Sequence, residues 1–159
     1  MQHRAAIVTV SDGVSAGTRE DGSGDTAERL LREAGFEVVT RRVVPDERPE
    51  IEAALRELGA THGLVVTTGG TGFGPRDVTP EATRAVIERD APGFAEAMRA
   101  EALRQTPMGM LSRGVSGISG RTLIVNFPGN PKAVEQLFPV IAPALAHAVE
   151  TLGSDAGSH

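Results

Sequence analysis

The feature that most restricts the fold is a regular alternation between short apolar runs and longer segments with one apolar helical face. Residues 25–34 and 49–59 carry apolar side chains at the spacing of an amphipathic helix. Apolar runs typical of buried strands surround them, at residues 5–10, 36–44, 64–68 and 121–127. Such alternation is typical of a mostly parallel sheet with helices on both faces. We therefore predict an α/β protein, a three-layer α/β/α sandwich with a mostly parallel sheet.

Proline and glycine indicate where individual helices begin and end. Pro49 suits the first turn of a helix that Gly59 would end. Pro80 suits the first turn of another helix, with Thr79 as its N-cap, and Pro92 is expected to break that helix.

The C-terminal half is less regular. Residues 106–120 are rich in Gly, Ser and Met, and we predict that they form a loop. Residues 132–152 have a helical pattern, and we expect Pro139 and Pro143 to interrupt the helix.

Length and composition exclude several classes of protein. A chain of 159 residues favours one domain, to which we assign residues 1–153, with residues 154–159 as a disordered tail. The absence of cysteine excludes disulfides and thiolate nucleophiles. A net charge of −5 argues against broad binding to nucleic acid or anionic membranes. The first apolar run is too short for a signal peptide or a membrane span, so we predict a soluble, cytoplasmic protein.

Polar and glycine-rich segments follow all four predicted strands. These segments are residues 11–13, 45–47, 68–72 and 126–131. Because the carboxyl ends of parallel strands meet at one edge of a sheet, we expect the four segments to share one pocket.

The densest signal is the run Thr-Thr-Gly-Gly-Thr-Gly-Phe-Gly at residues 67–74. Its four glycines in six residues, 69–74, let the backbone approach a ligand and direct N–H groups at an anion. The alternative is a surface turn without a ligand. No Gly-Lys-Ser/Thr ending and no Gly-x-Gly-x-x-Gly motif accompanies the run, which disfavours Walker-type hydrolysis and dinucleotide binding.

Two aspartates accompany the glycine run. Asp77 follows it directly, and Asp46 follows the second strand, so both carboxylates are expected at the same edge. Mg²⁺ typically takes one or two carboxylates together with waters and substrate phosphates. The pair therefore favours metal-assisted phosphoryl or nucleotidyl transfer, although each aspartate alone is typical of a turn or cap. Asp12 and Glu47 are weaker candidates for the same site.

Other segments leave two interpretations open. Residues 112–117 bring Ser112, Arg113 and Ser116 together, either to hold a second phosphorylated substrate or as an ordinary loop. Residues 126–131 either shape a base or ribose pocket or form a turn before a helix. The histidines lack metal-ligand spacing, and no Gly-x-Ser-x-Gly elbow occurs, which disfavours a hydrolase.

Over nearly its whole length the chain resembles the molybdenum cofactor biosynthesis proteins of the MogA and MoaB type, which include the G domain of gephyrin. The matching segments are residues 9–12, 21–24, 44–47, 67–80 and 112–131. The most specific is Thr-Thr-Gly-Gly-Thr-Gly followed by Pro-Arg-Asp-Val-Thr-Pro-Glu-Ala.

This resemblance implies a molybdopterin adenylyltransferase, a nucleotidyltransferase that moves AMP from Mg-ATP to the terminal phosphate of molybdopterin and releases pyrophosphate. It implies ATP and molybdopterin as substrates, Mg²⁺ as cofactor, a homo-oligomer with a trimer favoured over a hexamer, and a molybdate insertase as partner. The same family contains members with little activity, so a non-catalytic molybdopterin-binding scaffold is the alternative. The presence of Asp46 and Asp77 weighs against the scaffold.

The resemblance also assigns roles to single residues. Asp46 and Asp77 match the catalytic, metal-associated aspartates of the family. The positions that match substrate and nucleotide contacts are Ser11, Asp12, Thr68, Gly69, Gly70, Thr71, Gly72, Ser112, Ser116, Asn126, Pro128 and Gly129. The attacking group would be the pterin's own phosphate, which suits a chain without cysteine.

Overall fold

In the computed structural model, which describes residues 2–155, one six-stranded sheet organises the chain. The strand order is β2-β1-β3-β6-β5-β4. The parallel strands are β1 (Arg4–Val10), β2 (Glu37–Val44), β3 (Leu64–Thr68) and β6 (Thr122–Phe127). Next to β6, β5 (Ser116–Ser119) runs antiparallel to it, and β4 (Arg89–Asp90) runs antiparallel to β5. The predicted mostly parallel sheet is confirmed.

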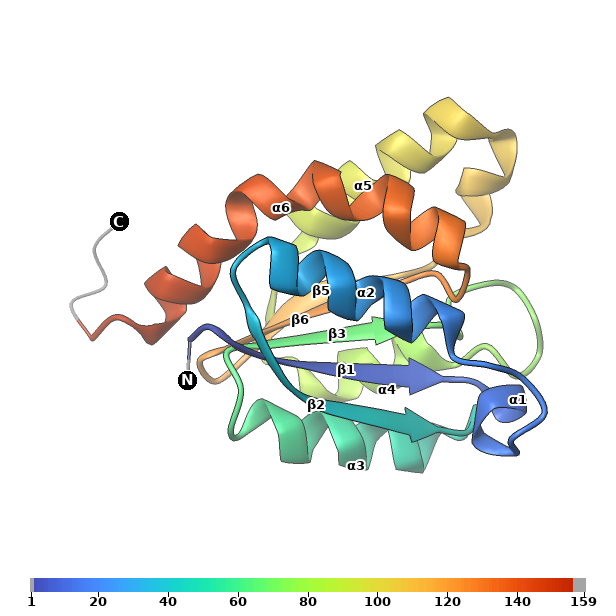
Figure 1. Ribbon diagram of the computed structural model, residues 1–159, viewed down its shortest axis with the longest axis horizontal. Coiled ribbons are helices and arrows are strands. Elements are labelled where there is room, and N and C mark those ends of the chain that lie inside the picture. Colours follow the sequence, from blue (N-terminus) through green and yellow to red (C-terminus); the bar gives the residue numbers. More distant parts are fainter. Residues whose placement is uncertain (1, 156–159) are drawn as a thin grey trace.

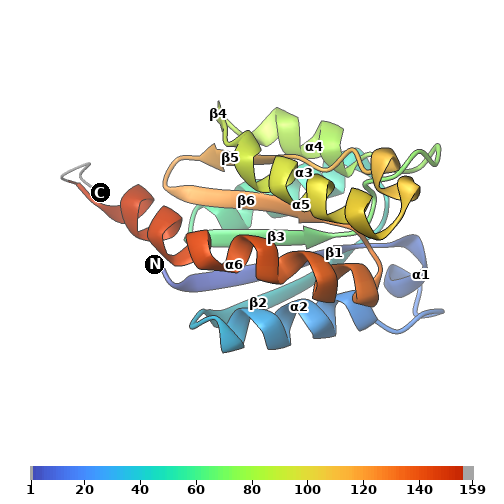
Figure 2. The ribbon, with the colours of Figure 1, turned by 90° about the horizontal axis from the view of Figure 1, so that it is seen from above.

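Helices cover both faces of this sheet, as Figures 1 and 2 show. One face packs against α2 (Gly22–Glu33), α5 (Pro92–Gln105) and α6 (Pro131–Gly153), and the other against α3 (Arg48–Gly59) and α4 (Thr79–Val86). Alternate residues of β1 serve the two cores, because Ile7 packs on the α2 and α6 side and Val8 on the α3 and α4 side. The three-layer prediction is therefore confirmed.

The helix starts follow local capping chemistry. The side chain of Asp21 accepts a hydrogen bond from the N–H of Gly24 at 3.0 Å, so α2 begins at Gly22, earlier than the apolar pattern indicated. The prediction of Thr79 as an N-cap was wrong. Thr79 is the first residue of α4, after Val78, and its hydroxyl donates to the carbonyl oxygen of Gly69 at 2.9 Å.

Two further expectations, one about the break at Pro92 and one about a loop at residues 106–120, were also wrong. The helix α4 ends at Val86, before β4, and Pro92 begins α5 instead of breaking α4. The segment predicted as loop contains the 3₁₀ helix η1 (Pro107–Leu111) and strand β5. This strand is only four residues long and pairs with β6 as a hairpin across the two-residue turn at residues 120–121, where Gly120 has a φ of 59°.

The last helix, α6, continues through both prolines. Pro139 and Pro143 lie on its exposed side, where the carbonyls that lose a helical partner can reach water. Within residues 2–155, no helix combines the length and the apolar content that crossing a membrane requires. Of the tail predicted to be disordered, Asp155 pairs with Arg121, and residues 156–159 lie outside the described residues.

Candidate active site

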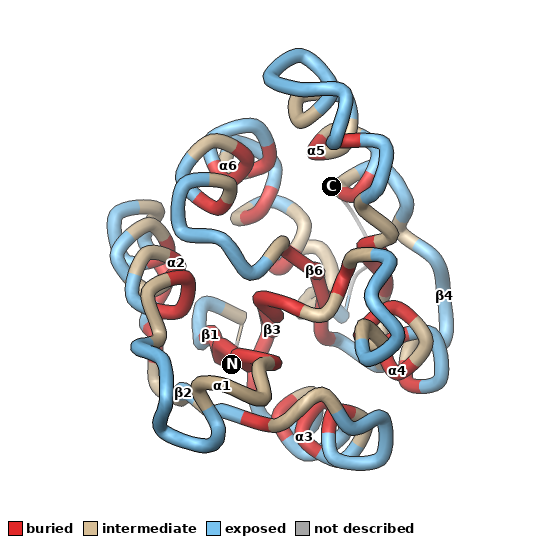
Figure 3. Tube along the Cα trace, turned by 90° about the vertical axis from the view of Figure 1, so that its right-hand side faces the viewer, coloured by how far each residue is buried: buried red, intermediate tan, exposed pale blue. Residues whose placement is uncertain are grey.

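A pocket of about 630 Å³ opens at the carboxyl edge of the parallel strands. Figure 3 views this edge and shows the buried ends of β1, β3 and β6 between the two layers of helices. Each of the four predicted segments contributes to the lining, with Ser11 after β1, Asp46 after β2, residues 69–72 after β3, and residues 128–129 after β6. The four segments that were expected to share one pocket, because each follows a parallel strand, therefore do line the same pocket.

Most of the residues proposed from the sequence line this pocket. They are Ser11, Asp46, Thr68, Gly69, Gly70, Thr71, Gly72, Asp77, Ser112, Pro128 and Gly129. Asp12, Ser116 and Asn126 do not line it.

Asn126 and Ser116 instead form hydrogen bonds in the interior of the protein. The amide of Asn126 donates to the hydroxyls of Thr67 and Thr83 at 2.9 and 3.1 Å, and its Oδ1 accepts from the N–H of Val115 at 3.1 Å. The hydroxyl of Ser116 donates to the carbonyl of Ala91 at 2.6 Å and accepts from the N–H of Ala95 at 3.1 Å. Both buried side chains therefore hold the sheet to its helices.

The glycine loop is a fixed turn. Gly69 and Gly70 have φ values of 95° and 71°, a region that favours glycine. A Cβ at Gly69 would lie 2.3 Å from the carbonyl oxygen of Val10, and one at Gly70 would lie 2.2 Å from Oγ1 of Thr79. The N–H of Thr79 also donates to the carbonyl of Gly70 at 3.1 Å. Only residues without a side chain fit here, so the wall of the pocket at this point is backbone.

Asp12 and Asp46 support each other. The N–H of Asp12 donates to Oδ2 of Asp46, and the N–H of Asp46 donates to Oδ1 of Asp12, both at 2.9 Å. Arg76 also binds Asp12, at 2.6 Å, and Glu47, at 3.0 Å. The contact with Arg76 lowers the pKa of Asp12. This reciprocal pair joins the loops after β1 and β2.

Asp46 ionises less readily than Asp12. Burial raises the pKa of Asp46, and the nearby charges of Asp12 and Asp77 raise it further. Asp77 itself accepts a hydrogen bond from the N–H of Gly74 at 2.9 Å. A cation at this point would stabilise ionised Asp46. No group of three or more His, Cys, Asp or Glu side chains in residues 2–155 is arranged to hold a metal ion.

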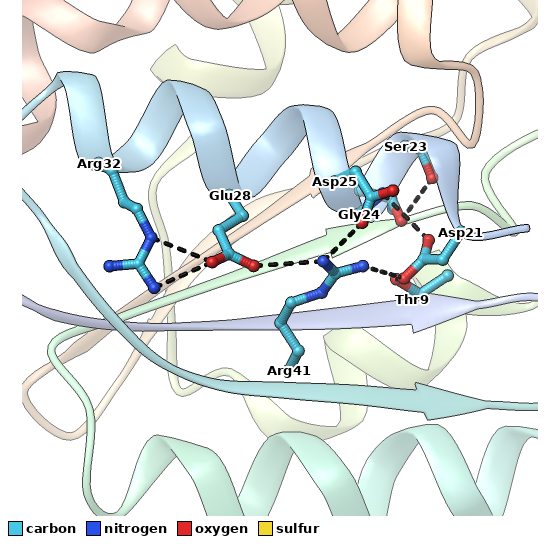
Figure 4. A network of polar contacts seen from close by, with 9 residues as sticks. Thr9, Asp21, Ser23, Gly24, Asp25, Glu28, Arg32 and Arg41 are labelled. Atoms are coloured by element: carbon cyan, nitrogen blue, oxygen red, sulfur yellow. Dashed lines mark hydrogen bonds and ion pairs between the residues drawn. The ribbon is translucent and has the colours of Figure 1, made fainter.

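The N-terminus of α2 forms another part of the pocket, to which the sequence analysis gave no role. Figure 4 shows how Asp21 fixes it, with Oδ2 accepting from the hydroxyl of Thr9 at 2.8 Å and from Arg41 at 2.6 Å. Arg41 also binds Asp25 at 2.7 Å. Thr9, Gly22 and Ser23 line the pocket, and the first N–H groups of a helix favour an anion. The run Asp-Gly-Ser-Gly was the available signal, because aspartate is a strong N-cap.

A second missed part is the wall formed by α5 and η1. It contributes Ala102, Gln105, Thr106, Met108, Gly109 and Leu111 to the pocket. Met108 and Leu111 are exposed apolar side chains beside the opening. Sequence reasoning missed this wall because it treated residues 106–120 as loop.

The contacts of the Arg113 guanidinium separate the two interpretations that the sequence left open for residues 112–117. The guanidinium does not line the pocket and instead binds Glu81 at 2.7 Å and the carbonyl oxygens of Gly72 and Asp77 at 2.8 and 2.7 Å. The interpretation that it holds a phosphorylated substrate is therefore not supported by its contacts, while its neighbour Ser112 does line the pocket.

The fold and the pocket define a class of α/β proteins with a ligand-sized pocket at the carboxyl edge of a parallel sheet. The family described as "Probable molybdopterin binding domain" matches residues 6–147. The chain belongs to this family of molybdenum cofactor biosynthesis proteins.

Individual relatives agree with this membership. The chain is 45% identical over 138 residues to the molybdopterin adenylyltransferase of Haemophilus influenzae, a match that covers 84% of this chain and 70% of that protein. It is 42% identical over 153 residues to the molybdenum cofactor synthesis protein cinnamon of Drosophila melanogaster, covering 94% of this chain but 25% of that longer protein. The crystal structure of the molybdopterin biosynthesis enzyme MoaB from Thermus thermophilus superposes with a TM-score of 0.88 at 45% identity, covering 94% of this chain and 95% of that one.

Proposed function

We propose that this chain is a molybdopterin adenylyltransferase, which transfers AMP from Mg-ATP to the terminal phosphate of molybdopterin and releases pyrophosphate. The observation that carries the proposal is that one pocket contains both the backbone wall of the glycine loop and the carboxylates of Asp46 and Asp77. The relative from Haemophilus influenzae that bears this name supports it over 84% of the chain.

In the proposed reaction, an oxygen of the molybdopterin phosphate attacks the α-phosphorus of ATP. The new P–O bond forms as the bond between the α-phosphorus and the bridging oxygen breaks, and the electron pair leaves with pyrophosphate. Because the substrate supplies the nucleophile, the chain needs no covalent intermediate. Its task is to position two phosphorylated molecules and to offset their charge.

The residues divide this task between them. Gly70, Thr71 and Gly72 leave the backbone open to a phosphate group, and the N-terminus of α2 adds partial positive charge on the other side. The apolar wall of α5 and η1 is suited to an aromatic ring, which it would contact without tryptophan or tyrosine, since the sequence contains neither.

Asp46 and Asp77 would hold Mg²⁺, which when bound lowers the repulsion between the phosphates and the attacking oxygen. A cation suits this position because burial and the neighbouring carboxylates oppose the negative charge on Asp46, and a bound cation would offset that charge. Two carboxylates are also as many as Mg²⁺ commonly takes when substrate phosphates and waters complete its coordination.

The proposal extends to the setting of the enzyme. We place it in the cytoplasm as a homo-oligomer, a trimer before a hexamer, that hands its product to a molybdate insertase. These extensions rest on the resemblance of the sequence to its family. A solution mass from sedimentation equilibrium would distinguish a monomer, a trimer and a hexamer.

The test is to incubate the chain with ATP, Mg²⁺ and molybdopterin and to separate the products by chromatography. We expect adenylyl-molybdopterin and pyrophosphate in equal amounts, and no product when a chelator removes Mg²⁺. ATP with a methylene group between the α- and β-phosphorus is the matched control, since the bond that must break is replaced. Binding of molybdopterin without any adenylyl product from ATP would contradict the proposal and favour the non-catalytic scaffold.

A further inference from the structure

Arg113 binds the glycine loop at three points. Its backbone N–H donates to the carbonyl oxygen of Thr71 at 2.8 Å. Its guanidinium then reaches three groups in three directions, with Nε on the carbonyl of Gly72 at 2.8 Å, Nη2 on the carbonyl of Asp77 at 2.7 Å, and Nη1 on Oε2 of Glu81 at 2.7 Å. One side chain therefore joins Gly72, Asp77 and the helix α4 that follows.

The loop needs such a tie because its middle projects from the protein. Phe73 has 68% of its surface exposed, and Gly74, Pro75 and Arg76 are exposed as well. Between the two ends, Asp77 and Gly74 bond each other, through the N–H of Asp77 at 3.0 Å and its carboxylate at 2.9 Å. These local bonds shape the turn, and two arginines fix it to the rest of the protein. Arg76, in its middle, binds Asp12 and Glu47. The guanidinium of Arg113 holds Gly72 and Asp77, on either side of the projecting part, to each other and to α4.

Glu81 anchors this arrangement. It lies in the first turn of α4, and both oxygens contact the guanidinium, at 2.7 and 3.4 Å. The bond to Arg113 lowers the pKa of Glu81, so the carboxylate is ionised at neutral pH. The anchor thus holds the charge of Arg113 on the far side of the loop, away from the pocket.

We propose that Arg113 is a positioning residue that fixes Gly72 and Asp77 for adenylyl transfer without contacting either substrate. The inference rests on the proposed function. A planar guanidinium can donate in three directions at once, whereas a lysine ammonium is a compact point charge on a flexible chain that does not match this arrangement. The identity of the side chain should therefore matter as much as its charge.

The competing role is direct binding of a substrate phosphate, and the kinetic constants separate the two. Loss of a phosphate contact would weaken binding and raise KM for ATP or molybdopterin. Loss of positioning would lower kcat, because a displacement of about 1 Å at the reacting groups costs about 100-fold in rate. Measuring kcat, both KM values and the dissociation constant for molybdopterin decides between them.

The experiment compares Arg113→Lys and Arg113→Ala with Arg56→Ala in the full chain. Arg56 is a matched control because it too binds a backbone carbonyl and a glutamate, but away from the pocket. It contacts the carbonyl of Ala85, near the end of α4, at 3.1 Å, and Glu52 within its own helix α3 at 3.7 Å. We expect kcat to fall about 100-fold in both Arg113 variants, because the reacting groups would be displaced. The molybdopterin dissociation constant should stay within about twofold of the wild-type value. The control should keep the wild-type kcat.

Chemical rescue adds a readout that a purely structural role would not move. Guanidinium ion, added well below the concentration that unfolds the protein, should restore part of kcat in Arg113→Ala but not in Arg113→Lys, where the lysine side chain occupies the site. Sodium chloride at the same ionic strength should restore nothing in either variant.

The outcomes are distinguishable from failure of the proposed function. An inactive wild type overturns the proposed function itself. An active wild type with a fully active Arg113→Lys variant, or with variants whose KM rises while kcat is unchanged, overturns the positioning role. If Arg113→Ala does not fold, Arg113→Lys and Glu81→Gln decide, and wild-type kcat in both would contradict the inference.

Discussion

The two edges of the parallel sheet use similar residues for opposite purposes. At the amino edge, the hydroxyl of Thr122 lies 2.6 Å from the carbonyl oxygens of Gly59 and His62, and the ring of His62 contacts Thr40 and the carbonyl of Leu58, each at 3.0 Å. At the carboxyl edge, comparable polar groups surround a pocket of about 630 Å³.

Chain direction explains the difference. In a parallel sheet, strand ends and helix N-termini meet at the carboxyl edge, so N–H groups and carboxylates converge there around open space. At the amino edge the polar groups find partners in each other. Residue type alone does not distinguish the two situations, whereas residue type combined with strand order does.

The largest expected effect comes from removing a carboxylate charge at the carboxyl edge, which tests whether the polar groups there act in catalysis. We expect Asp46→Asn and Asp77→Asn each to abolish detectable transfer, a loss of about 100- to 1,000-fold or more, because the variants lose electrostatic stabilisation of the transition state. Molybdopterin binding should remain measurable, because the defect lies in placing the metal and ATP. Product chromatography and a binding titration check both points.

The control for these variants is Asp90→Asn, on the exposed edge strand β4 and outside the pocket. It should retain full activity. Substantial turnover by either Asp46→Asn or Asp77→Asn would show that catalysis does not depend on this edge in the way proposed.

A second test compares the stability of alanine variants at two glycines, one at each edge of the sheet, that have nearly equal φ angles. Gly69 has φ 95° at the carboxyl edge, and Gly35 has φ 94° near the amino edge. A Cβ would meet the carbonyl oxygen of Val10 at 2.3 Å in the first case and nothing within 4 Å in the second.

Both alanine variants should lose about 1–2 kcal/mol for the left-handed backbone. Gly69→Ala should lose a further 1–3 kcal/mol, approximately, for the close contact. Denaturant unfolding measures both free energies. Equal losses in the two variants would mean that the turn at Gly69 relaxes freely, which would contradict the fixed backbone wall.

The smallest expected effect lies at the amino edge. Burial lowers the pKa of His62 below its ordinary value of 6.5. The unfolded chain therefore binds more protons than the folded chain as the pH falls below 6.5, and the free energy of unfolding should decrease over that range. Above it, His62 is neutral in both states and contributes no slope.

The measurement is the free energy of unfolding at a series of pH values for the wild type and for His62→Gln. The variant should be less stable at every pH, because it disturbs buried hydrogen bonds, but its slope below pH 6.5 should be shallower. An unchanged slope would assign the pH dependence to other groups.

Most of the fold could be predicted because its signals are local. The run at residues 64–68 matches β3 over its whole length, and Pro49 and Gly59 bracket α3 as expected. The errors concern pairing partners. Strand β5 is short and depends on β6, from which a two-residue turn separates it, and the hydroxyl of Thr79 donates to the carbonyl of Gly69. The prolines of α6 were misjudged because their exposed side was not known.

The site was predictable to the extent that strand order defines it. The loops with Asp46 and Asp77 meet as expected, whereas Asn126 and Ser116, next to the same strand ends, turn into the protein. Whether a side chain points inward or toward the pocket depends on register and on buried partners, which a linear pattern does not contain. The roles of the pocket residues in catalysis stay predictions.

The mutual support of Asp12 and Asp46 has a consequence for how this sequence can change over evolutionary time. Each carboxylate holds the backbone of the other, so a substitution at either position disturbs two loops at once. Neither position can drift alone, and we expect positions 12 and 46 to covary among relatives. Acceptable replacements at position 12 would keep an oxygen acceptor, whereas position 46 should also keep its carboxylate wherever the protein remains an adenylyltransferase. A lineage that loses Asp46 should lose Asp12 soon after.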